Sequence, residues 1–151
     1  MDDLRELYQE TILDHNKKPR NFRRLEDANR EADGRNPLCG DELTLYARVN
    51  DDGVVEEVTF EGSGCAISKA SASLMTDFVK GKSEADVEAD VERFHKLVTS
   101  SPSTPPETGE LGKLAVFAGV REYPMRVKCA TLAWHALRAA LENEGAVAKT
   151  E

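Results

Sequence analysis

Several features that mark common protein classes are missing from this chain of 151 residues. It has no apolar run approaching the ~20 residues that a membrane-spanning helix needs, so we expect no membrane association. It also has no excess of basic residues. The 28 acidic and 20 basic side chains give a formal net charge of −8 and a pI of about 5.0. Nucleic acid binding needs a basic surface, so we expect no nucleic acid partner.

We also expect neither a secretory leader nor a disulfide framework. The N-terminal residues Met1-Asp2-Asp3-Leu4 are acidic and lack the apolar core of a signal peptide. The chain has only three cysteines, an odd number, and no C-x-x-C pair of the zinc-finger kind. We therefore expect a cytoplasmic protein whose reduced thiols serve metal or sulfur chemistry.

The apolar pattern predicts a single α+β domain over residues 1–151. Apolar and polar residues alternate over 42–50, as in a half-buried strand. A turn at Asn50-Asp51-Asp52-Gly53 and a returning strand over 54–60 complete a β-hairpin. A further strand near 30–36 would make a small antiparallel three-stranded sheet, and we expect helices to pack on one of its faces.

Helical patterns flank this hairpin on both sides. We expect helices from Asp2 to just before Pro19, from just after Gly64 to Lys80-Gly81, from Ser83 to about Thr99, near 110–118, and from about Pro124 to Glu144. The proline-rich segment from Thr99 to Gly109 is expected to be an exposed loop, and the tail from Gly145 is expected to fray.

A basic run follows the first helix and consists of Lys17, Lys18, Arg20, Arg23 and Arg24. Such a run is typical of a solvated turn. The alternative is a docking patch for an acidic partner.

The three cysteines lie at the ends of predicted elements, where sites are commonly built. Cys39 stands in a Pro-x-Cys-Gly-Asp turn before the hairpin. Cys65 follows Gly64 at the start of a helix, where free amides and the helix dipole favour a thiolate. Cys129 falls in the first turns of the last helix, shortly after Pro124.

If these ends converge, the three thiolates and the carboxylate of Asp41 make a four-ligand set for zinc. The same thiols would also suit sulfur or an iron–sulfur cluster. Three thiolates, one carboxylate and Zn²⁺ carry an excess negative charge, which Arg126 and Lys128 would offset. The alternative is that the cysteines are separate, small buried residues. None of the three histidines, His15, His95 and His135, is expected to be a ligand, and His135 is expected at the surface.

The cysteine segments resemble those of the U-type iron–sulfur cluster assembly family, the group of IscU, the NifU N-domain and SufU. The resemblance rests on Asn36-Pro37-Leu38-Cys39-Gly40-Asp41, on Gly62-Ser63-Gly64-Cys65-Ala66-Ile67-Ser68 with the residues up to Ser73, on Arg126-Val127-Lys128-Cys129-Ala130, and on Asp14-His15-Asn16 with Pro19-Arg20-Asn21. It spans nearly the whole chain. The family fold that it implies, SufE/NifU-like, is α+β with helices on one face of a small sheet.

Two departures from the IscU pattern make the chain more similar to SufU. IscU-type scaffolds have a histidine immediately before the third cysteine, where this chain has Lys128. IscU-type scaffolds also lack an insertion before the last cysteine segment. In this chain, residues 92–113 look like that extra segment. This likeness implies a zinc-bound sulfur acceptor that works with a SufS-type cysteine desulfurase and passes sulfur to downstream iron–sulfur assembly proteins.

The resemblance implies Cys39, Asp41, Cys65 and Cys129 as metal ligands. We expect Cys39, on its glycine turn, to accept the persulfide sulfur, and Arg126 to order the site. In the alternative function, Cys39, Cys65 and Cys129 hold iron or a [2Fe–2S] cluster that is assembled and handed on. A purely structural zinc site is a third hypothesis.

Overall fold

The computed structural model describes residues 2–37, 40–103, 105, 109–142 and 146–149. Within these ranges, none of the helices combines the length and the apolar character that crossing a membrane requires. The α+β class predicted from the sequence is confirmed.

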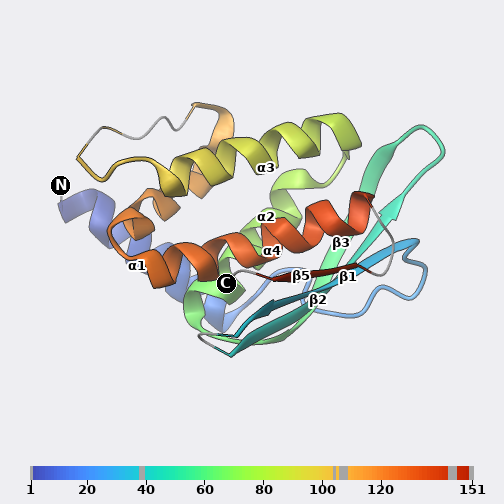
Figure 1. Ribbon diagram of the computed structural model, residues 1–151, viewed down its shortest axis with the longest axis horizontal. Helices are drawn as coiled ribbons and strands as arrows, with labels where there is room; N and C mark the ends of the chain where they lie inside the picture. Colours follow the sequence, from blue (N-terminus) through green and yellow to red (C-terminus); the bar gives the residue numbers. More distant parts are fainter. Residues whose placement is uncertain (1, 38–39, 104, 106–108, 143–145, 150–151) are drawn as a thin grey trace.

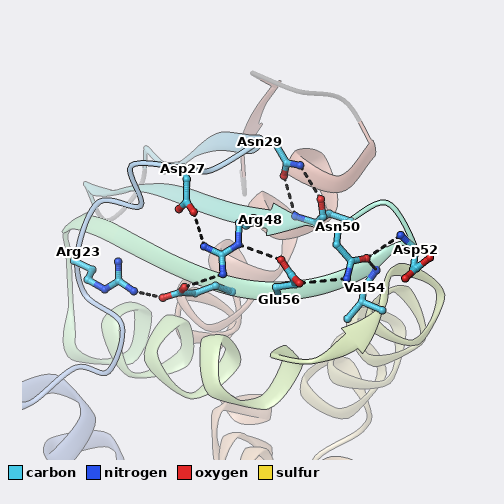
Figure 2. Close-up of polar contacts among 10 residues, drawn as sticks. Arg23, Asp27, Asn29, Arg48, Asn50, Asp52, Val54 and Glu56 are labelled. Atoms are coloured by element: carbon cyan, nitrogen blue, oxygen red, sulfur yellow. Dashed lines mark hydrogen bonds and ion pairs between the residues drawn. The ribbon is translucent and has the colours of Figure 1, made fainter.

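Three long antiparallel strands form the centre of the sheet. They are β1 (Arg30–Asn36), β2 (Asp41–Val49) and β3 (Val54–Ser63). The predicted hairpin turn joins β2 to β3. The side-chain oxygen of Asn50 accepts hydrogen bonds from the backbone N–H groups of Asp52 and Val54, at 2.9 and 3.0 Å, and Gly53 has a φ of +78°. Figure 2 shows this turn beside the polar contacts of the neighbouring strands.

Two short strands extend the sheet to five, in the order β4-β3-β2-β1-β5. Strand β4 (Lys82–Ser83) pairs with the start of β3, and β5 (Ala146–Lys149) runs parallel to β1. The prediction of three strands was therefore wrong, and so was the prediction of fraying over 146–149, whereas Gly145, Thr150 and Glu151 lie outside the described residues. The free edge of β1 offers unpaired backbone groups, and the chain that leaves the last helix pairs with them.

The helices lie on one face of the sheet (Figure 1). They are α1 (Asp2–Lys17), α2 (Ala66–Val79), α3 (Glu84–Thr99) and α4 (Pro124–Glu142), close to the predicted bounds. The helix expected near 110–118 is instead the 3-10 helix η1 (Gly109–Glu122), which is interrupted at Gly112. Helices α2 and α4 contact the long strands β1, β2 and β3, whereas α3 and η1 pack mainly against other helices, with α3 also meeting the short strand β4. The segment 92–113 covers the end of α3 and the start of η1, and its origin as an insertion stays a prediction.

Aromatic residues join α3, α4 and η1. Phe94 stacks on Trp134 with ring centroids 4.5 Å apart and meets the edge of Phe117 at 5.7 Å. All three side chains are buried. Ser71 of α2 ties the same region together, because its Oγ accepts from Trp134 Nε1 at 3.2 Å and donates to the Ala130 carbonyl at 2.6 Å. The helices that carry two of the cysteine segments are thus fixed relative to each other.

The basic run of residues 17–24 is partly neutralised by the protein itself. Arg20 pairs with Asp14 at 2.8 Å, and Arg23 pairs with Glu57 of β3. Nearby, Figure 2 shows the guanidinium of Arg48 between Asp27 and Glu56. These pairs support the interpretation of the run as a solvated connection tied to the protein surface.

Candidate metal and sulfur site

Three separate segments of the fold bring potential ligands to one point. Asp41 begins β2, Cys65 caps the N-terminus of α2, and Cys129 lies in the second turn of α4. One ligand atom from each residue lies within 4.8 Å of the other two. The structure therefore brings together three of the four predicted ligands, while the fourth, Cys39, lies outside the described residues.

Asp41 is buried, with 1% of its surface exposed, and it is fixed to the start of α2. Its Oδ1 accepts a hydrogen bond from the backbone N–H of Cys65 at 2.8 Å, and its Oδ2 lies 3.9 Å from Cys65 Sγ. This approach depends on Gly64, since a Cβ at that position would lie 2.6 Å from Asp41 Oδ1. The glycine before Cys65 thus leaves room for the carboxylate.

Cys65 is exposed and sits at the N-cap of α2, as the sequence predicts. Its Sγ accepts from the backbone N–H of Ser68 at 3.5 Å. A hydrogen bond with Cys129 is the largest influence on the Cys65 thiol and, with the helix amides, lowers its pKa to about 7 against the opposing effects of burial and of the Asp41 charge. A substantial fraction of Cys65 is therefore thiolate at neutral pH in the metal-free protein.

Cys129 is buried and is contacted by a residue whose role the sequence reasoning missed. Asn36, at the end of β1 and 1% exposed, donates from Nδ2 to Cys129 Sγ at 3.7 Å. Its backbone carbonyl also accepts from Gly40 N at 2.8 Å, and it stands opposite Asp41 in the β1–β2 ladder. The sequence feature that could have indicated this role is the position of Asn36 directly before Pro37, at the end of a predicted strand.

The two basic residues predicted near Cys129 differ in their surroundings. Arg126 is exposed, and its guanidinium lies 4.5 Å from the ring centroid of Tyr123, which is also exposed. Lys128 is half-buried. The offset of site charge by these residues stays a prediction.

The described histidines do not join the cluster. His15 is buried, with its Nδ1 2.7 Å from Ser73 Oγ. His135 was expected at the surface, but it is half-buried between α4 and α3, where its ring meets that of His95. The buried face of α4 is wider than its apolar stripe, because α3 covers part of the side that carries polar residues.

The donor set fits zinc. A Zn²⁺ ion bonded to one thiolate and one carboxylate would hold sulfur and oxygen about 3.5 Å apart in a tetrahedral site. The observed separation of Cys65 Sγ and Asp41 Oδ2 is 3.9 Å, so small side-chain rotations suffice. The three residues leave a fourth position for one more ligand, which the sequence assigns to Cys39.

Comparison with known proteins decides the family. A family model described as the NifU-like N terminal domain matches residues 7–130. The chain belongs to this family. The resemblance seen in the cysteine segments is thereby confirmed.

Individual relatives cover most of the chain. The iron–sulfur cluster assembly scaffold protein IscU of Streptococcus pyogenes serotype M1 is 39% identical over 93% of this chain and 86% of its own length. The zinc-dependent sulfurtransferase SufU of Bacillus subtilis is 38% identical over 91% of both chains. The crystal structure of a putative SUF-system scaffold protein, FiSufU from Fervidobacterium islandicum AW-1, matches with a TM-score of 0.81 and 34% identity, over 91% of this chain and 98% of that one. Proteins named as scaffold and as sulfurtransferase are thus equally similar to this chain.

Proposed function

We propose that this protein accepts sulfur for iron–sulfur cluster assembly, taking it from the persulfide of a SufS-type cysteine desulfurase onto Cys39. The observation that carries the proposal is the convergence of Asp41, Cys65 and Cys129. Membership of the NifU-like family and similarity to a zinc-dependent sulfurtransferase support it.

Zinc is the metal we propose for the site, with Asp41, Cys65, Cys129 and Cys39 as ligands. When bound, it would keep the thiols deprotonated near neutral pH and hold them in place. The carboxylate favours a reactive site over a closed structural one, because structural zinc sites are usually formed by cysteine and histidine alone.

The division of work among the cysteines follows from their settings. Cys129 is buried, and Cys65 is fixed as the N-cap of α2. Cys39 is two residues from Asp41 in the chain and beside Gly40, whose φ of +75° is easily adopted by glycine. We therefore assign the attack on the partner's persulfide to Cys39, while Asp41, Cys65 and Cys129 remain as anchors.

The transfer is a thiolate–persulfide exchange. The Cys39 thiolate attacks the outer sulfur of the desulfurase persulfide, so a new sulfur–sulfur bond forms on Cys39. The sulfur–sulfur bond of the desulfurase breaks, and its cysteine leaves as a thiolate. The sulfur keeps its oxidation state, so the step needs no oxidant or reductant. We propose that Arg126, exposed near the start of α4, helps to order the site against the partner.

The test is the turnover of a SufS-type desulfurase with L-cysteine, with and without this protein. We expect the wild-type chain to stimulate turnover and Cys39→Ala to abolish the stimulation. A matched control, Ser63→Ala, changes an exposed residue near Cys65 and should retain it. Unchanged stimulation by Cys39→Ala would rule out Cys39 as the acceptor.

A second candidate function is a scaffold that assembles a [2Fe–2S] cluster on Cys39, Cys65 and Cys129. The same clustered thiols favour it, since cysteine thiolates hold such clusters. The similarity to proteins named IscU scaffolds adds support. Anaerobic reconstitution with iron and sulfide distinguishes the two: a stable chromophore with stoichiometric iron favours the scaffold, and its absence favours sulfur transfer.

A further inference from the structure

A pair of histidines lies on the seam between α3 and α4, apart from the cysteine cluster. The ring centroids of His95 and His135 are 5.9 Å apart, and their planes meet at 61°. Directly beside them, the stacked rings of Phe94 and Trp134 hold the two helices together. We propose that His95 and His135 bind a divalent transition-metal ion, with Zn²⁺ as the natural candidate, and that this ion bridges α3 and α4.

The spacing of the two rings suits this role. With Zn–N bonds of about 2.0–2.1 Å and a tetrahedral angle at the metal, one ion bonded to a nitrogen of each ring would place the ring centroids about 5.2 Å apart. The observed 5.9 Å is within about 1 Å of this spacing. Binding would require the two side chains to rotate from their edge-to-face arrangement, so that a nitrogen of each ring points to the same ion.

The rings are also available as ligands. Across the described part of the chain, neither imidazole has a hydrogen-bond partner. Burial lowers the pKa of His135, and the nearby His95 and Arg138 lower it further. His135 is therefore neutral at pH 7, the form in which imidazole binds metal.

The charge that acts most directly on the pair is that of Arg138, which disfavours added positive charge at His135 and is partly neutralised by carboxylates of α3. Arg138 is the basic group nearest to His135 along its own helix, and it is paired with Glu88, at 3.4 Å, and with Glu92. These two carboxylates, on α3, counter its positive charge. The remaining positions on the metal are open to water, so the site should be weaker than one built from three thiolates and a carboxylate.

The proposed site is separate from the cysteine site. His135 lies six residues beyond Cys129 on α4, about 9 Å along the helix axis. The cluster of Asp41, Cys65 and Cys129 includes neither histidine. The inference therefore stands independently of the proposed sulfur transfer.

The experiment is a zinc titration of protein that already carries one equivalent of zinc, followed by calorimetry and by NMR of the histidine rings. The chain has only three histidines, so buried His15 is an internal control. We expect a second, weaker binding step that shifts the ring signals of His95 and His135 and leaves those of His15 in place.

Variants sharpen the result. His95→Ala/His135→Ala should lose the second step, each single variant should weaken it about tenfold or more, and Lys96→Gln, an exposed neighbour on α3, should retain it. No second step in the wild type, an equal shift of His15, or retention of the step in the double variant would overturn the proposal. The NMR result on the wild type stands even if a variant fails to fold.

Discussion

The glycine before Cys65 offers a sharp test of how the site is built. In Gly64→Ala the new Cβ would lie 2.6 Å from Asp41 Oδ1 and 3.1 Å from its Cγ. Normal contact would require the carboxylate to move by roughly 1 Å. That movement would break the 2.8 Å hydrogen bond that Asp41 accepts from Cys65 N.

The magnitude follows from the character of this bond. A hydrogen bond to a charged acceptor contributes about 1.5–3 kcal/mol, and Asp41 is too buried for water to replace it fully. Alanine also has less conformational freedom than glycine in the unfolded chain, which offsets about 0.4–1 kcal/mol of this loss in stability. We therefore expect Gly64→Ala to lower the free energy of unfolding by about 1–2 kcal/mol, and to weaken zinc binding because Asp41 is displaced.

The assay is urea unfolding of the metal-free protein together with competitive zinc titration. In a double-mutant cycle with Asp41→Ala, the penalty of Gly64→Ala should largely disappear, since no carboxylate remains to clash. Gly34→Ala is the control, because its Cβ would contact Leu132 and Ala136 instead of the site. Additive effects of Gly64→Ala and Asp41→Ala would refute the reasoning.

Three further predictions concern the same end of the molecule. In metal-free protein, the alkylation rate of Cys65 should rise with a midpoint near pH 7, because the hydrogen bond with Cys129 stabilises its thiolate; a midpoint near the ordinary value of 9.0 would contradict this. Folding lowers the pKa of the Cys65 thiol, so this group adds to the free energy of unfolding above its unfolded pKa. That contribution is lost as the pH falls through about 7. Asn36→Leu should shift the thiolate-to-cobalt absorption band of cobalt-substituted protein, because it removes a donor to Cys129 Sγ, and an unchanged band would count against that contact. Ser71→Ala should cost about 1–3 kcal/mol in urea unfolding by leaving the indole N–H of Trp134 unpaired, whereas a loss within error would show that another group satisfies it.

Sequence reasoning predicted the elements with strong periodicity. The hairpin of β2 and β3 and the helices α2, α3 and α4 all lie near their predicted bounds, because alternation and helical stripes are local signals. Strand β5 was missed, since its pairing depends on the distant edge of β1 and its four residues carry no pattern of their own. The 3-10 form of η1 also escaped prediction, since its irregular turns give no regular stripe.

The candidate site divides in the same way. The turn and helix-start settings of Asp41, Cys65 and Cys129 left open whether they meet, the family resemblance implied that they do, and the structure brings them within 4.8 Å. Asn36 was not singled out, because its contact with Cys129 joins residues 93 positions apart. The burial of His135 was missed for a similar reason, since it depends on how α3 lies over α4.

The most direct test of the account is to locate the transferred sulfur. The zinc-loaded protein is incubated with a SufS-type desulfurase and L-cysteine, alkylated, digested and analysed by mass spectrometry. The account predicts one extra sulfur atom on the peptide that carries Cys39, and none on those that carry Cys65 or Cys129. Sulfur on either of these two residues instead, or unmodified cysteines in a chain that accumulates iron and sulfide, would contradict it.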